Sequence, residues 1–259
     1  MTPNLQETVA WARAAGALLR EGYGKRHSID HKGRIDLVTE MDRKVESLLL
    51  GSVRERYPDH TILSEESGHL NGSEQHCWYI DPLDGTTNYA HSIPTFAVSI
   101  AYAEAGQVQM GVVYEPMRDE CFTAERGCGA YLNGERITVS ATQDLLTSLM
   151  VTGFPYDASV TGKTNLENFA HFTRLTQGVR RMGSAACDLC YIAAGRFDGY
   201  WETILQPWDL AAGTLIVQEA GGVVTTLAGD PNFMQPPYAI LVGNPKVHSL
   251  MLKEFLEQL

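Results

Sequence analysis

The chain has 259 residues, of which 44% are hydrophobic and 20% are charged. This composition is typical of a folded protein with a sizeable core and gives no sign of disorder. Its 20 basic and 31 acidic residues leave a formal net charge of -11, which argues against a nucleic-acid-binding surface, because such surfaces concentrate Lys and Arg. An acidic protein can still bind a phosphorylated small molecule when metal ions supply the positive charge.

The sequence predicts a protein of the cytoplasm rather than of a membrane or an oxidising compartment. It has no apolar run of about twenty residues, and residues 1–20 carry Glu7 and lack the pattern of a signal peptide. Five cysteines, an odd number, fit a reduced protein better than a disulfide scaffold. Cys187 and Cys190 form a C-x-x-C pair, for which a zinc half-site or a redox pair is the functional alternative. Because no second Cys/His pair with zinc-like spacing accompanies them, we expect two inert core cysteines.

In the first half of the chain, helices precede antiparallel strands. Apolar residues at helical spacing predict a helix from Leu5 to about Gly22 and a second one from about Met41 to near Pro58. Strands are expected at residues 61–63, 78–80, 96–103, 108–114, 130–132 and 136–139, with hairpin turns around residues 105–107 and at Asn133-Gly134.

From about residue 146 onward, strands and helices alternate, which indicates a layered α/β protein. Strands are expected at residues 149–152, 197–201, 223–226 and 239–242, and helices at residues 165–176, 184–194, 209–220 and from Pro245, a residue that suits a first helical turn. We therefore divide the chain into an N-terminal lobe, residues 1–143, with helices and an antiparallel sheet, and a C-terminal α/β lobe, residues 144–259.

Carboxylates stand at five places where a strand ends or a helix begins, which is where α/β proteins collect functional residues. Most have an ordinary structural explanation when taken alone. Thr39 and Asp42 have the spacing of a capping box, and Asp209 would favour the positive end of the helix that it opens. Glu65-Glu66 fits a solvated loop, and Glu202 by itself is uninformative.

The segment Asp81-Pro82-Leu83-Asp84-Gly85-Thr86-Thr87 resists such an explanation. An apolar strand runs into one Asp, and a second Asp follows three residues later at a turn that Pro82 and Gly85 permit. Two carboxylates so close repel each other unless a cation holds them, so the pair indicates a metal. The following Gly-Thr-Thr is expected to begin a helical turn that offers N–H groups and a hydroxyl to an anion. Metal-binding acids beside an anion site are typical of a phosphoester site.

Four segments together resemble the inositol monophosphatase family, and the resemblance covers nearly the whole chain. They are Asp36-Leu37-Val38-Thr39 with Asp42, Glu65-Glu66-Ser67, Trp78 to Tyr89, and Pro207-Trp208-Asp209-Leu210-Ala211-Ala212-Gly213. Ser64 departs from the family pattern, in which Gly is common. The resemblance implies an α/β (α+β) fold, the layered α-β-α-β-α sandwich of the inositol monophosphatase and fructose-1,6-bisphosphatase type. It also implies a lithium-sensitive phosphatase that forms a homodimer.

By the same resemblance, Glu65, Asp81, Asp84, Asp209 and the Leu83 carbonyl would hold two or three Mg²⁺, which prefers such oxygen ligands. Asp42 and Thr86 would be catalytic, Thr86 being hydrogen-bonded toward Asp42 and orienting a metal-activated water. Substrate contacts are implied at Glu65, Leu83, Asp84, Gly85, Thr86, Gly183, Ser184, Ala185, Glu202 and Asp209. Most metal ligands would thus come from the N-terminal lobe, and the last ligand and several substrate contacts from the C-terminal lobe.

The implied reaction is Mg²⁺-dependent hydrolysis of a phosphate monoester, with myo-inositol 1-phosphate as first choice. Related phosphatases act on fructose 1,6-bisphosphate, histidinol phosphate or 3′-phosphoadenosine 5′-phosphate, and a moonlighting protein-binding regulator is an alternative of another class. The expected partner is a small phosphorylated polyol, with neither nucleic acid nor membrane. Residues 153–156 are expected at the pocket rim, whereas the sequence leaves open whether Arg180 and Arg181 contact substrate or a dimer edge.

Overall fold

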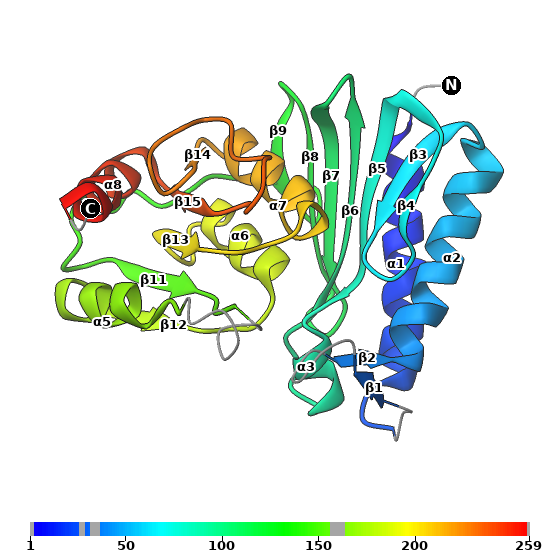
Figure 1. Cartoon of the computed structure of the whole chain (residues 1–259), viewed down its shortest axis with the longest axis horizontal. Helices are drawn as coiled ribbons and strands as arrows, with labels where there is room; N and C mark the ends of the chain where they lie inside the picture. Colours follow the sequence, from blue (N-terminus) through cyan, green and yellow to red (C-terminus); the bar gives the residue numbers. More distant parts are fainter. Residues whose placement is uncertain (1–2, 26–28, 32–36, 156–163, 258–259) are drawn as a thin grey trace.

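The structure is a computed structural model that describes residues 3–25, 29–31, 37–155 and 164–257. Five layers, α-β-α-β-α, follow one another across the molecule (Figure 1). In order they are α1 (Leu5–Gly22) with α2 (Glu40–Arg56), an eight-stranded sheet, α6 (Ala185–Ala193) with α7 (Pro207–Glu219), a five-stranded sheet, and α5 (Leu166–Leu175) with α8 (Pro245–Glu257). The layered fold predicted from the sequence is confirmed.

The eight-stranded sheet, called the large sheet below, has the strand order β10-β9-β8-β7-β6-β5-β3-β4. Its strands are β3 (His60–Ser64), β4 (Gly68–Leu70), β5 (Ser73–Asp84), β6 (Ala97–Glu104), β7 (Gln107–Glu115), β8 (Glu120–Glu125), β9 (Gly129–Leu132) and β10 (Glu135–Ile137). All neighbours are antiparallel except β3 and β5, which are parallel. Both predicted hairpin turns are present. At the second, Asn133 and Gly134 have positive φ angles of 50° and 85°, the conformation that an Asn-Gly turn supplies at little cost.

The five-stranded sheet, called the small sheet below, has the order β12-β11-β13-β15-β14. Its strands are β11 (Leu149–Thr152), β12 (Gly178–Arg180), β13 (Gly199–Glu202), β14 (Val223–Thr225) and β15 (Ile240–Gly243). β11 is parallel to both of its neighbours, and β15 is antiparallel to both of its own. A two-stranded ribbon, β1 (Ile29–His31) and β2 (Leu37–Thr39), and the short helix α3 (Thr86–Ala90) complete the described elements.

The structure corrects several expected boundaries. β5 has twelve residues and continues through Asp81 to Asp84, well beyond the expected residues 78–80. α7 begins at Pro207, two residues before the expected start, because proline suits the first helical position. The short strands β1, β2, β4, β8 and β12 carry no apolar periodicity strong enough to be expected from the sequence.

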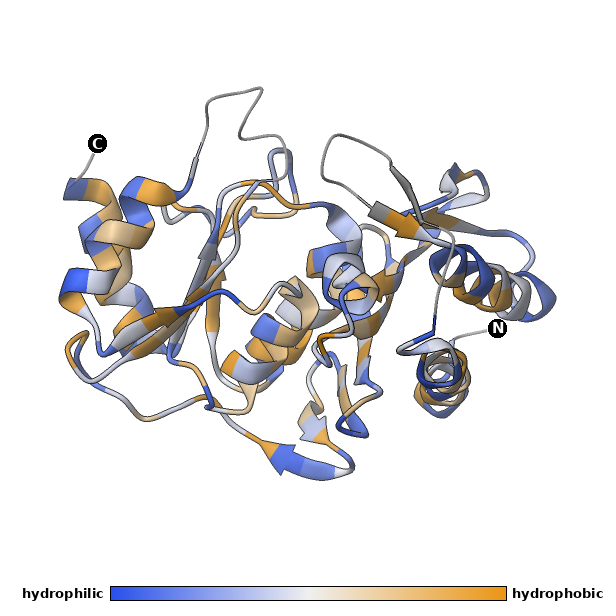
Figure 2. Cartoon of the chain, turned by 90° about the horizontal axis from the view of Figure 1, so that it is seen from below, coloured by the Kyte–Doolittle hydropathy of each residue, from blue (hydrophilic) through white to orange (hydrophobic). Residues whose placement is uncertain are grey.

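The burial of the helices follows from the layer in which they lie. α1 and α2 cover the outer face of the large sheet and bury one face each, so both carry a mixture of hydrophilic and hydrophobic residues (Figure 2). α6 lies between the two sheets, and every one of its residues is buried. Cys187 and Cys190 belong to this buried helix as free cysteines, and burial raises the pKa of both thiols. The expectation of inert core cysteines is therefore confirmed. No helix in the described ranges is both long and apolar enough to span a membrane.

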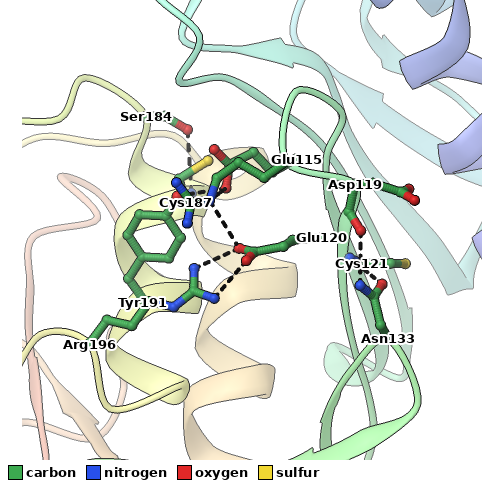
Figure 3. Close-up of polar contacts among 10 residues, drawn as sticks. Glu115, Asp119, Glu120, Cys121, Asn133, Ser184, Cys187, Tyr191 and Arg196 are labelled. Atoms are coloured by element: carbon green, nitrogen blue, oxygen red, sulfur yellow. Dashed lines mark hydrogen bonds and ion pairs between the residues drawn. The ribbon is translucent and has the colours of Figure 1, made fainter.

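Polar contacts also attach α6 to the large sheet (Figure 3). The Tyr191 hydroxyl donates to Glu115 Oε2 at 2.6 Å, and the Arg196 guanidinium binds both carboxylate oxygens of Glu120 at 2.6 and 2.7 Å. Glu115 ends β7 and Glu120 begins β8. These contacts fix the position of the helix whose first turn reaches the candidate site described next.

Candidate active site

One cavity of about 440 Å³ brings together most of the residues singled out in the sequence. Its walls come from the end of β5, the segment after β3, the start of α3, the segment after β11, the start of α6, the end of β13 and the start of α7. Both sheets and the helix layer between them therefore contribute. Among the expected site residues, those lining the cavity are Glu65, Asp81, Leu83, Asp84, Gly85, Thr86, Gly183, Ser184, Ala185, Glu202 and Asp209. Asp42 lies behind this wall and reaches it through Thr86.

Asp81 and Asp84 lie at the irregular end of β5. Asp81 pairs with Ser99 and Asp84 with Ala97, so three residue steps in β5 face two in β6. Such a bulge bends a strand and changes the direction of its side chains. Leu83 N donates to Asp81 Oδ1 at 2.9 Å, which holds this carboxylate at the bulge. The two acids are thus close together as expected, but the strand end itself carries them rather than a turn beyond it.

Gly85 and Thr86 make the transition from β5 to α3. Gly85 has a φ angle of 97°, and a Cβ atom there would lie 3.0 Å from the Thr95 carbonyl oxygen, so both conformation and space favour glycine. The Thr86 hydroxyl lies 2.9 Å from Asp42 Oδ1 and 3.0 Å from the Leu83 carbonyl oxygen. The hydrogen bond expected between Thr86 and Asp42 is therefore present.

Asp42 serves two purposes in this arrangement. Its Oδ2 accepts hydrogen bonds from the Thr39 amide at 2.7 Å and the Thr39 hydroxyl at 2.6 Å, which caps the start of α2. Its other oxygen remains for Thr86. Burial raises the pKa of Asp42, and the bonds from Thr39 and Thr86 oppose that shift. The capping explanation and the predicted contact to the site are both correct.

Asp84 connects the large sheet to the start of α6. Its Oδ2 accepts from the Ser184 hydroxyl at 2.6 Å and from the Ala186 amide at 2.7 Å. Burial raises the pKa of the Asp84 carboxyl, while these donors and the nearby Arg181 charge lower it. Residues 183–185 therefore lie beside Asp84 because its carboxylate binds the amino end of their helix.

Asp209 and Glu65 approach the cavity from two further elements. Asp209 stands in the first turn of α7, where its Oδ2 accepts from the Gln206 amide at 2.8 Å. Glu65 follows β3, and its amide donates to the Ile80 carbonyl of β5 at 3.2 Å. This backbone bond places Glu65 next to the strand that carries Asp81.

Glu202 ends β13 on the side of the cavity formed by the small sheet. The Tyr200 hydroxyl donates to Glu202 Oε2 at 2.5 Å, and burial raises the pKa of Glu202 to about 7. Gly153 lies directly against this carboxylate, because a Cβ atom at position 153 would overlap its oxygens. The Gly153 carbonyl in turn accepts from the Asn165 amide at 2.7 Å, so the backbone behind Glu202 is fixed.

Burial and mutual repulsion both act on the carboxylates of the cavity, and burial is the larger effect. Burial raises the pKa of Asp81 well above its usual range, and the charges of Glu65, Asp84 and Asp209 raise it further. The pKa of Asp209 is raised by burial and then by Asp84. A divalent cation among these oxygens would remove the repulsion. Among the described residues, no three His, Cys, Asp or Glu side chains already stand in the arrangement of a metal site.

A family model for the inositol monophosphatase family matches residues 2–259. The chain belongs to this family. It is 44% identical over 262 residues to Nus factor SuhB of Escherichia coli K12, covering all of this chain and 98% of the relative. It is 50% identical over 237 residues to inositol-1-monophosphatase of Synechocystis, covering 91% of this chain and 82% of the relative.

A solved structure agrees with this membership. The inositol monophosphatase of Anabaena superimposes with a TM-score of 0.89 at 43% sequence identity, covering 98% of this chain and 95% of the other. Family membership supports a phosphatase that depends on metal ions. It leaves the substrate open, because relatives of similar identity carry both the names SuhB and inositol-1-monophosphatase.

The cavity also contains residues that the sequence did not single out or did not assign. Asp188 was missed, although it stands one helical turn after Ser184 and therefore on the same face of α6. Arg181 lines the cavity, whereas Arg180 lies on the edge strand β12. The expected rim residues 153–155 line the cavity, while Tyr156, like Asp36 of the first family segment, lies outside the described residues.

Proposed function

We propose that this inositol monophosphatase family member uses Mg²⁺ to hydrolyse the phosphate monoester of a small polyol. We further propose that myo-inositol 1-phosphate is its preferred substrate. The observation that carries the proposal is the convergence of Glu65, Asp81, Asp84 and Asp209 from separate elements on one cavity. Buried acids that repel one another are costly unless they bind a cation. The cavity volume of about 440 Å³ lies in the usual range for small-ligand clefts.

The donor set fits Mg²⁺. Carboxylates and a backbone carbonyl are hard oxygen ligands, and no nitrogen or sulfur ligand is needed. Glu65, Asp81, Asp84, Asp209 and the Leu83 carbonyl would hold the ions. When bound, Mg²⁺ would neutralise charge on the phosphate and make a water molecule more acidic.

Thr86 and Asp42 would orient the attacking water. The Asp42 carboxylate lies 2.9 Å from the Thr86 hydroxyl and accepts its proton in a hydrogen bond. The lone pairs of Thr86 Oγ1 are then available to accept a hydrogen bond from a water molecule in the cavity. Asp42 itself is positioned by its cap on α2, so the hydroxyl has a fixed direction.

Glu202 and the start of α6 would bind the substrate from the other side. The Glu202 carboxylate is buried and held by Tyr200, and such an acceptor suits a hydroxyl of a polyol. Gly183, Ser184 and Ala185 line the same cavity as Glu202 and the acids of β5, and Ser184 donates to Asp84. This arrangement supports a substrate whose phosphate faces the acids of β5 and whose alcohol faces the small sheet.

A phosphate-release assay with a panel of monoesters, with Mg²⁺ and with EDTA, tests the proposal. The panel contains myo-inositol 1-phosphate, fructose 1,6-bisphosphate, histidinol phosphate and 3′-phosphoadenosine 5′-phosphate. Asp81→Asn keeps the shape of the side chain and should lower kcat by about 10³-fold, whereas Asp59→Asn, at an exposed loop residue, should leave it unchanged. Mg²⁺-dependent activity of Asp81→Asn equal to wild type would refute the assignment, and preference for histidinol phosphate would change the substrate.

A protein-binding regulator is the second candidate, and the relatives named Nus factor SuhB support it. The acids lining the cavity favour catalysis, but one chain can serve both functions. A strain whose only copy carries Asp81→Asn separates them. If loss of the protein impairs growth, normal growth of that strain would assign the growth role to binding, and impaired growth with folded protein present would assign it to catalysis.

A further inference from the structure

Asp188 has an unusual environment that the proposed function leaves unexplained. It is 2% exposed and lines the cavity, yet its Oδ1 has no hydrogen-bond partner. An unpaired buried polar atom costs roughly 1–3 kcal/mol, and more when it is charged. Native proteins retain few such atoms, and each calls for an explanation, such as a catalytic role or a bound water or ion.

The location of Asp188 indicates which part of a ligand it would meet. Ser184 caps α6 and donates to Asp84, and Asp188 lies one turn further along the same face of the helix. The charges that act on it most strongly are those of Glu202 and then Asp84, with Arg181 opposing them. Asp188 therefore lies one turn further along α6 than Ser184, the residue that binds Asp84. It is close to Glu202, on the side that the proposed function gives to the alcohol.

Contacts of Tyr191 and of the segment after α6 hold this helix in a fixed position, so Asp188 keeps its place in the cavity wall. Figure 3 shows Tyr191 directed toward Glu115, and Arg196, which follows the helix, directed toward Glu120. These contacts hold the helix against the large sheet. Asp188 therefore stays in the cavity wall, where its buried Oδ1 still lacks a partner.

We propose that Asp188 accepts a hydrogen bond from a hydroxyl group of the alcohol part of the substrate, beside Glu202, and so selects phosphate esters of polyhydroxylated alcohols. This inference rests on the proposed function and adds a specificity residue to it. A hydroxyl is a donor that fits, because a carboxylate accepts strongly from O–H groups.

The test compares myo-inositol 1-phosphate with cyclohexyl phosphate, which has the same six-membered ring without the other hydroxyls. The measured quantity is the ratio of kcat/KM for the two esters. In Asp188→Ala this ratio should fall about 10- to 100-fold. In Asp188→Asn, which keeps one acceptor oxygen, the ratio should fall less. Cys190→Ala, a change at a buried residue of the same helix outside the cavity, should keep the wild-type ratio.

The melting temperature provides a second readout, which distinguishes a role in substrate binding from a purely structural role. Asp188→Ala removes a buried carboxylate whose Oδ1 is unpaired, so its melting temperature should equal or exceed that of the wild type. A lower melting temperature with equal losses on both esters, or an unchanged ratio, would overturn the inference. Failure of the wild-type protein to hydrolyse either ester would instead reject the proposed function from which the inference follows.

Discussion

Gly153 and Glu202 show how a residue without a side chain shapes the candidate site. A Cβ atom at position 153 would overlap the Glu202 carboxylate, and the Gly153 carbonyl is already bound by Asn165. Neither partner can withdraw easily, because Tyr200 binds Glu202 and Asn165 also accepts from the Trp201 indole at 2.8 Å. The glycine therefore makes room for a carboxylate that must remain in place.

Gly153→Ala should displace Glu202 and lower kcat/KM for myo-inositol 1-phosphate by about 10²-fold, the loss expected from a shift of about 1 Å in a site. Gly51→Ala is the matched control, because Gly51 lies in α2 with nothing within 4 Å of the added atom. That change should raise the free energy of unfolding by about 0.5–1 kcal/mol and leave kinetics unchanged. Wild-type kinetics in Gly153→Ala would show that Glu202 is free to move.

His60 makes stability depend on pH. It is buried and stacked against His76 with ring centroids 4.6 Å apart, and its Nδ1 accepts from the Trp78 indole at 3.1 Å. Burial lowers the pKa of His60, and the His76 charge lowers it further. In the unfolded chain His60 therefore becomes protonated near pH 6.5, whereas in the folded protein it becomes protonated only at lower pH.

Because the unfolded state binds more protons, the contribution of His60 is complete above about pH 6.5 and is lost as pH falls below it. Urea unfolding at pH 7.5 and pH 5.5 should show lower stability at the lower pH. The difference should shrink in His60→Gln, whose amide oxygen can still accept from Trp78. Equal pH dependence in both proteins would show that His60 makes no contribution.

At the scale of residues, the acids singled out in the sequence line one cavity, whereas several of their neighbours gave no signal. Asp81 and Asp84 were identifiable because like charges so close in the chain need a reason to be there. Asp188 gave no such signal, since an acid in the first turn of a helix usually has a capping role. Its unpaired oxygen appears only when the surrounding chain is folded. The same holds for Gly153, whose importance depends on a residue about fifty positions away.

Among the elements, α6 depends most on contacts made outside itself. It is buried between two sheets and packs with apolar residues of β7 and β8, and polar contacts of Tyr191 and of Arg196, which follows the helix, are added to this packing. Glu115 is 1% exposed, its Oε1 has no partner, and its Oε2 accepts from Tyr191. The position of the first turn of α6 at the cavity therefore relies on an acid that is only partly paired.

Tyr191→Phe should lower the free energy of unfolding by about 1–3 kcal/mol, because it removes the hydrogen bond of a buried carboxylate. Tyr131→Phe removes a solvent-exposed hydrogen bond to the Cys128 carbonyl and should change stability by less than about 0.5 kcal/mol. Denaturant unfolding of both variants provides the comparison. If the two variants were equally stable, Glu115 would have to pair with another group when Tyr191 is absent.

Element prediction succeeded where one periodicity governed the segment. α1 and α2 match the expectation almost to the residue because their apolar spacing reflects a single buried face, and β11 matches it as a short apolar run buried on both faces. β5 was too short in the prediction, because Pro82 and two acids look like a turn although a bulge keeps them in the sheet. β12, three residues long at a sheet edge, is defined by pairing with β11 rather than by its own composition.

At the scale of the whole molecule, the layers join at the candidate site. The large sheet supplies Asp81 and Asp84, the segment after β3 supplies Glu65, and α7 of the middle layer supplies Asp209. The sequence indicates that each acid ends or begins an element, but nothing local indicates that these ends meet. That information came from the family resemblance, because contacts between residues more than a hundred positions apart have no signature in spacing.

Repulsion among these acids across layers predicts that Mg²⁺ stabilises the whole fold. An ion that binds only the folded state raises the free energy of unfolding by about 2.7 kcal/mol at a hundred times its dissociation constant. The wild-type melting temperature should therefore rise with Mg²⁺ and return to its starting value with EDTA. Asp209→Asn should melt higher than wild type without Mg²⁺, because it relieves repulsion on Asp81, and should gain less from the ion.

Asp230→Asn is the matched control for that experiment, since Asp230 lies in an exposed loop outside the cavity. Its gain from Mg²⁺ should equal that of the wild type. An equal gain in Asp209→Asn would mean that the ion binds elsewhere, and α7 would then have no part in metal binding. A smaller rise in melting temperature would show that Asp209 takes part in binding the ion. The ion would then join α7 of the middle helix layer to the large sheet, two elements that are far apart in the sequence.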